Sequence, residues 1–462
     1  MKQSNFRRTA FALAGVSLTI ALSACGGGDG DPGGTTPQAA AQQCATNGTC
    51  TPSGPTVNQP VAAICPSVLD FNTTYTGGSG AGEFVKIQLD STKGTYRIQF
   101  LESPVPQTTA DIYPTRAGVT VTGTMSHPTR PLPTEAQNNC AYELKTATAS
   151  DGKSQALIDP ANPPILFVGN GVAGGGIPGA TIKYNGLGGT DAVPGFGAIP
   201  ATTFAMYPVL AFAETETDFS KVAGSYNVLG YHLIPSGGDP VSTDHFVPTV
   251  ANKVETINAD GTCTVASGNC VTTGKAWKLR AGTDGAFESF DSSGLKPYPF
   301  FFTQTFAAGN QTLAKGVLIV GKLEGKLVPL LVRVGYARVD FSDLTNIILS
   351  VDDESGIALL SPTTATTATA LKGGYVGSGS DFRYVASSLH DNVGAWLDPQ
   401  DPSLTPIGGF QMDLTQATRP GVVTTVDNSG QTGALITTGP VYAHLFGNAA
   451  SPTFRVSAVA NR

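Results

Sequence analysis

Charged side chains are scarce in this sequence. Asp, Glu, Lys and Arg make up 13% of its 462 residues, and 34 acidic residues face 27 basic ones, a formal charge of -7 at pH 7. Proteins that bind nucleic acid carry a basic excess, so no nucleic-acid partner is expected. Lys and Glu are few while the chain has 56 glycines and 32 prolines, a composition that favours strands and turns over long helices.

The common catalytic and metal-binding motifs are also missing. The sequence has no G-x-S-x-G serine motif and no HExxH motif. Neither of its short cysteine pairs has the C-x(2-4)-C spacing of a zinc site. We therefore predict no catalytic constellation, no metal and no cofactor. The five histidines are spread along the chain, at His127, His232, His245, His390 and His444.

The N-terminus predicts an export signal over residues 1–24. A basic start, an apolar stretch and a small-residue end follow one another there, formed by Lys2, Arg7 and Arg8, by Phe11 to Leu22, and by Ser23 and Ala24. The apolar stretch is too short for a mature transmembrane helix, which needs about 20 residues. Removing the signal takes away three basic residues and no acidic one, so the mature chain has a formal charge of -10.

Leu22-Ser23-Ala24-Cys25 resembles the lipobox of bacterial lipoproteins. The resemblance implies cleavage before Cys25 and acylation of its thiol with chains such as palmitate, which would anchor the protein to a lipid bilayer. Gly26 stands where an Asp typically retains such proteins in the inner membrane. The outer membrane, on its periplasmic or surface face, is therefore the expected location. An ordinary cleaved signal with an incidental cysteine is the alternative.

The mature chain is expected to begin with a tether and to continue as two modules. Residues 25–62 are rich in Gly, Thr, Pro and Gln and low in large apolar side chains, which predicts a flexible segment. The body that follows exceeds what one hydrophobic core usually holds. We predict β modules over 63–215 and 216–462.

Six cysteines remain once Cys25 carries lipid. An even number in an oxidising compartment predicts three disulfides, for which fifteen pairings are possible. The two short pairs each bracket a Gly-containing turn able to bring their ends together, and the remaining two would form a long bridge. The spacing thus suggests Cys44 with Cys50, Cys263 with Cys270, and Cys65 with Cys140. Zinc ligation by these pairs is the rival interpretation.

Short alternating segments predict an all-β protein. In the clearest hairpin, Val85, Ile87 and Leu89 share one face, and after a Gly-ended turn the partner strand places Tyr96, Ile98 and Phe100 together. A second hairpin is predicted around Asp151-Gly152, between Ala141–Leu144 and Ala156–Ile158. The expected architecture is an antiparallel sandwich or barrel, with a β-propeller as the alternative. Short Gly-x-Tyr or Gly-Tyr starts at Gly94, Gly224 and Gly374 favour duplicated modules, with chance similarity as the alternative.

Two glycine motifs are interpreted structurally. Gly169 to Gly174 fits G-x-G-x-x-G, but Gly175, Gly176, Pro178 and Gly179 follow and forbid the helix that a dinucleotide site needs, so a Gly-rich loop is predicted. Gly316 to Lys322 fits most of a P-loop but ends in Leu323, and its β-branched middle predicts a core strand.

Three polar groups and one aromatic run are the remaining candidates. Asp239, Asp244 and His245 share one loop, and His390-Asp391 is a second possible acid/base pair, but polar side chains exposed on surface loops explain both. The acidic run Asp352-Asp353-Glu354 could bind calcium but is interpreted as a solvated turn. Tyr298 to Phe302 predicts a strand buried on both faces, or one carrying a ligand surface.

The chain resembles a family of uncharacterised lipoproteins of Gram-negative bacteria, known as a domain of unknown function. The lipobox, Phe167 to Gly171 running to Ile177–Ala180, and Ala223 to Asn227 carry the resemblance. It implies no activity. We therefore expect a non-enzymatic envelope protein that binds a small molecule, a glycan or a protein partner. The alternative is an envelope hydrolase acting on glycan or another polymer.

Overall fold

The computed structural model describes most of the chain after residue 63 and two short segments before it. The described residues are 43–44, 50–51, 64–109, 114–129, 134–185, 189–193, 198–235, 246–271, 273–282, 284–291, 314–340, 348–352, 354–399, 401, 403, 405–448 and 451–461. Residues 41–462 form one compact unit. The predicted signal peptide and Cys25 lie outside the described residues, as do Asp239, Asp244, His245 and the aromatic run at 298–302.

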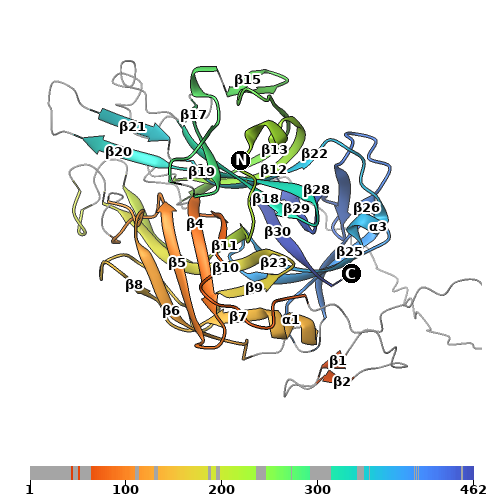
Figure 1. Ribbon diagram of the computed structural model, residues 1–462, viewed down its shortest axis with the longest axis horizontal. Helices are drawn as coiled ribbons and strands as arrows, with labels where there is room; N and C mark the ends of the chain where they lie inside the picture. Colours follow the sequence, from red (N-terminus) through yellow and green to blue (C-terminus); the bar gives the residue numbers. More distant parts are fainter. Residues whose placement is uncertain are drawn as a thin grey trace, which may run out of the picture. The chain divides into compact units, whose positions relative to one another are not determined.

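Antiparallel strands make up most of what is described, which confirms the all-β prediction (Figure 1). Helical segments in this part of the chain are short: α1 (Glu135–Cys140), α3 (Ala368–Leu371) and the 3-10 turns η1 (Phe219–Val222) and η2 (Thr273–Lys275). Within the described residues, no helix has the length and apolar character to cross a membrane.

Eight strands close into a first barrel in chain order. Each has a partner on both sides, because β5 pairs with β6 as well as β4, and β11 pairs with β3. Barrels of this kind remove the exposed edges of an open sheet. The strands are β3 (Tyr75–Ser79), β4 (Glu83–Asp90), β5 (Thr95–Glu102), β6 (Thr120–Ser126), β7 (Ala141–Leu144), β9 (Ile165–Gly169), β10 (Val172–Tyr184) and β11 (Ile199–Phe212), with β8 (Thr148–Ala149) added beside β6.

The hairpin predicted from alternation is confirmed as β4 and β5. Leu89 lies opposite Tyr96, and Ile87 lies opposite Ile98. The two predicted faces belong to one buried cluster inside the first barrel, together with Tyr207 and other inward-facing apolar residues. The barrel interior is therefore filled by its own side chains.

Two local predictions in this barrel are wrong. The strand Ala141–Leu144 pairs with β6 and β9, whereas Leu157 makes only an isolated bridge to Gly179, so no hairpin joins 141–144 to 156–158. The predicted Gly-rich loop is a two-residue turn followed by strand β10. Glycine is required within that strand because a Cβ on Gly175 would lie 2.1 Å from the Ile165 carbonyl oxygen.

An open sheet of nine strands follows the first barrel, here called the middle sheet. It contains the predicted core strand at Gly316, which confirms that the P-loop-like segment is β structure. Its strands, in spatial order, are β15 (Gly268–Val271), β14 (Cys263–Val265), β13 (Phe246–Ile257), β12 (Gly224–Pro235), β22 (Ser355–Pro362), β19 (Lys326–Val334), β18 (Ala314–Leu323), β17 (Ala286–Asp291) and β16 (Lys278–Leu279). Outside this sheet, β20 (Tyr336–Asp340) pairs with β21 (Ile348–Asp352), and β1 (Gln43–Cys44) pairs with β2 (Cys50–Thr51).

The last eight strands form a second closed barrel, here called the C-terminal barrel and coloured blue in Figure 1. Each strand pairs with the next in sequence, and β30 returns to β23. The strands are β23 (Gly373–Gly379), β24 (Tyr384–His390), β25 (Val393–Leu397), β26 (Pro406–Asp413), β27 (Val423–Asp427), β28 (Thr432–Thr438), β29 (Val441–Asn448) and β30 (Ser451–Asn461). The predicted barrel is confirmed, and the propeller alternative is wrong.

The middle sheet and the C-terminal barrel begin in the same way. A short helical turn ends in a buried Val222 or Leu371, and a tyrosine four residues later donates a hydrogen bond to that residue's carbonyl oxygen. The bonds from Tyr226 and Tyr375 are 2.7 and 2.8 Å long. This similarity favours the predicted duplication. The module boundary predicted at residue 215 falls between β11 and η1 and stays a prediction.

A buried ion pair inside the first barrel gives a stability prediction. Arg116 contacts both carboxylate oxygens of Glu83, at 2.7 and 2.8 Å, and both side chains are fully buried. Arg116→Met would leave the carboxylate unpaired, so we expect a loss of about 3 to 5 kcal/mol in the free energy of unfolding, measured by urea denaturation.

Lys183→Met is the matched control, because its partner Asp191 is 77% exposed and such pairs contribute about 1 kcal/mol or less. Equal losses in the two variants would contradict the stabilising role of the buried pair.

Candidate functional site

The acid/base pair predicted at His390 and Asp391 lies in an exposed turn. The His390 Nδ1 atom is 2.7 Å from an Asp391 carboxylate oxygen, but the side chains are 55% and 72% exposed. The turn joins β24 to β25, and Asp391 has a positive φ of 52°. The two residues contact each other, but both side chains are largely exposed to water, as expected for polar residues in a surface turn.

Glu354 corrects the prediction of a solvated acidic turn. It is buried, and its carboxylate accepts a 2.6 Å hydrogen bond from the Thr249 hydroxyl and lies 3.1 Å from both His232 Nδ1 and Arg333 Nη1. Burial alone would raise the pKa of Glu354, but the His232 contact and the Arg333 charge outweigh it and lower the pKa to about 2. Strand pairing of β22 with β12 and β19 assembles this cluster, which spacing along the chain does not reveal.

Two of the three predicted cysteine pairings are present as disulfides, Cys65–Cys140 and Cys263–Cys270. The first connects residues 75 positions apart, from the segment before β3 to the end of α1. The third pairing stays a prediction, although β1 and β2 place the backbones of Cys44 and Cys50 opposite each other.

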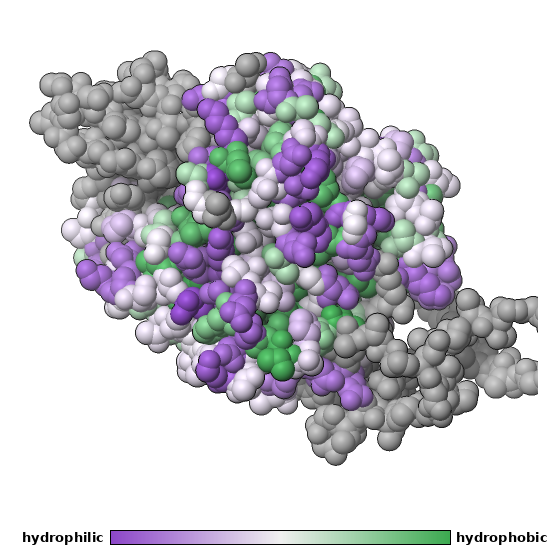
Figure 2. Space-filling model, in the orientation of Figure 1, coloured by the Kyte–Doolittle hydropathy of each residue, from purple (hydrophilic) through white to green (hydrophobic). Residues whose placement is uncertain are grey.

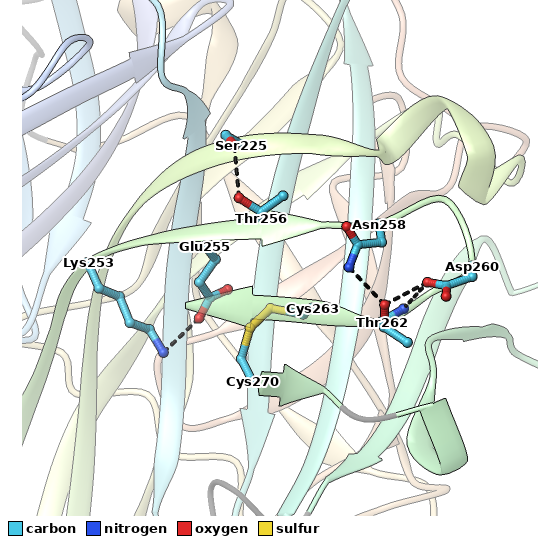
Figure 3. Close-up of a disulfide and its surroundings, with 9 residues drawn as sticks. All are labelled: Ser225, Lys253, Glu255, Thr256, Asn258, Asp260, Thr262, Cys263 and Cys270. Atoms are coloured by element: carbon cyan, nitrogen blue, oxygen red, sulfur yellow. Dashed lines mark hydrogen bonds and ion pairs between the residues drawn. A yellow bond between two sulfur atoms is a disulfide. The ribbon is translucent and has the colours of Figure 1, made fainter. Parts of the chain in front are cut away.

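Figure 3 shows the Glu255 side chain on β13 pointing toward the Cys263–Cys270 disulfide. One ligand atom from each of these residues lies within 4.8 Å of the others, close enough to share a metal ion. The sulfur atoms are bonded to each other, however, and the carboxylate is 2.6 Å from the Lys253 ammonium. Thiolate ligation would therefore require reduction of the disulfide.

The interior of the C-terminal barrel presents the most unusual chemistry. Along β29, Tyr442, His444 and Phe446 alternate with Val441, Ala443 and Leu445. The second set belongs to a core shared with the first barrel and the middle sheet, whereas Tyr442 belongs to the cluster inside the C-terminal barrel. His444 is opposite Arg455 on β30, so period-two alternation turns both side chains inward.

Four rings gather at one level of this interior. The Trp396 and Phe446 centroids are 4.3 Å apart with nearly parallel planes, and His444 lies 4.8 Å from Phe446 and 5.6 Å from Trp396. Phe410 is 4.5 Å from His444. Such offset ring contacts stabilise each other and leave an apolar wall.

Glycines on neighbouring strands make room for these rings. A Cβ on Gly394 would lie 2.2 Å from the Phe410 ring, and one on Gly408 would lie 2.8 Å from the Trp396 ring. Gly394 is opposite Phe410 and Gly408 is opposite Trp396, so each cross-strand pair combines one ring with one glycine. This alternation lets large side chains occupy an interior that is narrow in an eight-stranded barrel.

Arg455 lies over the ring cluster. Its guanidinium carbon is 4.9 Å from the Trp396 centroid and 5.4 Å from that of Phe446, the geometry of cation–π contacts. Its Nη2 atom is 3.4 Å from an Asp381 carboxylate oxygen, a long contact with a partly exposed side chain. Burial lowers the pKa of Arg455, with the Asp381 charge acting in the opposite direction.

His444 is held as a neutral ring. It is fully buried, and its Nε2 atom lies 2.8 Å from the Thr425 hydroxyl. Burial, followed by the positive charge of Arg455, lowers the pKa of His444 to about 3. The side chain therefore contributes a hydrogen-bonding group and no charge near neutral pH.

Several buried polar atoms in this interior have no hydrogen-bond partner among the described residues. Those at the ring cluster are Trp396 Nε1, His444 Nδ1, and Nε and Nη1 of Arg455. Buried polar groups are almost always paired, and an unpaired one costs about 1 to 3 kcal/mol. Four such atoms around one ring cluster indicate a place where an acceptor group would be stabilised.

The ring cluster lies toward one end of the barrel. Phe446 is half-buried and Asp381 is 36% exposed, so solvent reaches this layer. Tyr375 is opposite Val459 where β23 begins and β30 ends, and both belong to one apolar cluster with Leu371 of α3. Leu435 is opposite His444 and therefore borders the rings directly.

None of these interior residues was proposed as a site from the sequence. The sequence predicts no strand over 441–448 and no partner for His444, because the five histidines are spread along the chain. The sequence pattern that could have indicated the site is the alternation along β29, where apolar residues occupy one face and aromatic residues and a histidine occupy the other. Arg455 follows in the next strand.

A family profile matches most of the chain. The profile of a family described as "Protein of unknown function (DUF2957)" matches residues 95–458, which include most of the first barrel, the middle sheet and nearly all of the C-terminal barrel. The search of curated proteins found no match.

The depressed pKa of His444 gives a pH prediction. The unfolded chain takes up a proton near pH 6.5 that the folded chain takes up only near pH 3, so the stability due to neutral burial is complete above pH 6.5 and is lost as pH falls toward 3. In His444→Gln, urea unfolding midpoints should depend less on pH across this window. The exposed His390→Gln variant should keep the wild-type dependence; if both variants keep it, His444 is not buried as a neutral ring.

Proposed function

The chain belongs to a family of proteins of unknown function (DUF2957), and from this premise we propose that it is a lipid-anchored envelope protein that binds a small molecule inside its C-terminal barrel without chemically changing it. Binding rests on one observation, the group of unpaired donors and rings buried in that barrel. Anchorage rests on the sequence of the first residues.

The anchor is inferred from residues 22–25. An export signal that ends in Leu22-Ser23-Ala24-Cys25 supports acylation of Cys25, and the glycine-rich segment after it supports a tether between lipid and folded body. Acyl chains contribute about 0.8 kcal/mol of membrane affinity per buried methylene, so two or three chains hold a protein on a bilayer. Gly26 supports the outer membrane as its location.

A contrast between the two barrels supports binding in the second one. In the first barrel, the buried carboxylate of Glu83 receives hydrogen bonds from Arg116, Ser79 and Ser103, so the buried charges are paired. The Tyr207 hydroxyl in that interior has no partner among the described residues, but it carries no charge. In the C-terminal barrel, Arg455 makes one long contact with a carboxylate among the described residues, and two of its nitrogens have no partner there. Eight-stranded barrels either fill their interiors or hold one small ligand.

The chemistry of the site supports binding without turnover. Its unpaired nitrogens are those of an indole, an imidazole and a guanidinium, which orient and neutralise a ligand. His444 has a pKa of about 3 and is therefore a weak base near neutral pH. The hydroxyl that contacts His444 belongs to Thr425, and both atoms are buried. We infer a binding site and no hydrolytic one.

The described surface gives less support for a large apolar docking site. Figure 2 shows small hydrophobic patches separated by hydrophilic residues on the visible face. Among the described residues, Val247 and Val250 share β13, and Val393, Ile407 and Val426 lie on the adjacent strands β25, β26 and β27. The other large exposed hydrophobic residues are Val68, Val193 and Leu279. Single exposed apolar residues are ordinary on protein surfaces.

Anchorage is tested by Cys25→Ser in the full chain. The variant should lose incorporation of labelled palmitate and move from the membrane to the soluble fraction, because the acylated thiol is gone. Gly26→Asp is the control: it keeps the cysteine and should move the protein from the outer to the inner membrane. A Cys25→Ser protein that stays on membranes as firmly as wild type would overturn the anchor.

Binding in the barrel is tested with the two tryptophans, Trp277 and Trp396, one at a time. In Trp277→Phe, the neutral fluorophore N-phenyl-1-naphthylamine should quench Trp396 saturably by energy transfer. In the matched Trp396→Phe variant, quenching of Trp277, which lies between η2 and β16 and packs against the middle sheet, should be weaker. Absent or equal quenching in the two variants would contradict a binding site in the C-terminal barrel.

A further inference from the structure

We propose that the ligand of the C-terminal barrel is a small amphipathic monoanion, bound through its carboxylate by Arg455 and Trp396 with its apolar part against the ring cluster. This inference rests on the proposed function, since it names the chemical class of the molecule held in the same barrel. It follows from the charge balance, the donor set and the ring geometry of the site.

The charge balance requires an anion. Arg455 is buried, and the one carboxylate that it contacts among the described residues is Asp381, at 3.4 Å and partly exposed. A buried cation needs a close, well-hydrogen-bonded partner, as Arg116 has in Glu83. A carboxylate on the ligand would supply that partner. Because the site has one guanidinium and one distant carboxylate, it balances a ligand with one negative charge better than a ligand with two negative charges.

The donor set selects an acceptor group. Arg455 Nε and Nη1 and Trp396 Nε1 can only donate hydrogen bonds, and they have no partner in the described part of the chain. His444 Nδ1 can accept or donate according to its tautomer. A carboxylate is an acceptor at both oxygens and matches the planar fork of an arginine. A neutral amide would place a donor against these donors.

The surroundings select an apolar body. The Arg455 guanidinium lies over Trp396 and Phe446, so an anion that reaches its free nitrogens also comes close to the ring cluster. Gly379 holds this geometry, because a Cβ there would lie 2.9 Å from the Arg455 Cγ atom. Inorganic anions would meet the donors but leave the rings without contact.

The experiment compares carboxylates with their neutral amides. Full-length Trp277→Phe protein is titrated with benzoate, octanoate, benzamide, octanamide and inorganic phosphate, with Trp396 fluorescence as the readout. At least one carboxylate should bind about tenfold or more tightly than its amide, as the loss of a charge-assisted hydrogen bond predicts. Phosphate should bind more weakly than that carboxylate.

Variants of Arg455 test whether its guanidinium causes the preference for carboxylates over amides. Arg455→Gln should remove the difference between carboxylate and amide, and Arg455→Lys should keep part of it. The exposed Arg383→Gln on the neighbouring turn, checked with the others by circular dichroism, should behave as wild type. If Arg455→Gln does not fold, the ratio of carboxylate to amide affinity in the Trp277→Phe protein still tests whether the site prefers an anion.

Three results would overturn the inference: no carboxylate binds better than its amide, phosphate binds as well as the carboxylates, or Arg383→Gln weakens carboxylate binding as much as Arg455→Gln does. Saturable quenching by N-phenyl-1-naphthylamine alongside any of these results would leave barrel binding intact and remove only the anion. Loss of that quenching as well would remove the proposed function.

Discussion

Closure of the C-terminal barrel is the constraint on which the rest depends. Pairing of β30 with β23 gives every strand two neighbours and encloses one face of each strand, whatever its side chains are. On an open sheet, His444 and Arg455 would face water at little cost. Inside a closed barrel they lose that water, which lowers the pKa of His444 and leaves nitrogens of both residues without a partner in the part of the protein that the structure describes.

The glycines make this enclosure sterically possible. Gly394 and Gly408 each face a ring across the strand pair, so Phe410 and Trp396 fit side by side in a narrow interior. The first barrel uses the same device at Gly123, which is opposite Tyr96, but its buried arginine is fully paired with Glu83. Two barrels of equal strand number thus differ in what they leave unsatisfied, and this difference marks the second as the candidate binding site.

Much of the fold could be predicted from local patterns, and little of the site could. The alternation around Val85 and Tyr96 predicts a hairpin correctly, because the two strands are joined by a short turn and pair with each other. The hairpin predicted around Asp151 is wrong because the strand before it pairs with strands from elsewhere in the chain. The prediction that Glu354 is solvated is wrong because the strands β12 and β19, which pair with β22, bring partners to its carboxylate. The sequence does not identify His444 and Arg455 as site residues for the same reason. A histidine or arginine in a strand is expected to face solvent, and only closure of the barrel places these two side chains inside.

The most direct test of the account is a high-resolution crystal structure of the full chain purified from its own envelope without added ligands. The account predicts density for an oxygen-bearing group of an organic molecule within about 3 Å of Arg455 Nη1 and Trp396 Nε1, with the rest of that molecule against the Phe446 ring. Density for ordered water alone, bridging these nitrogens to the barrel wall, would contradict it.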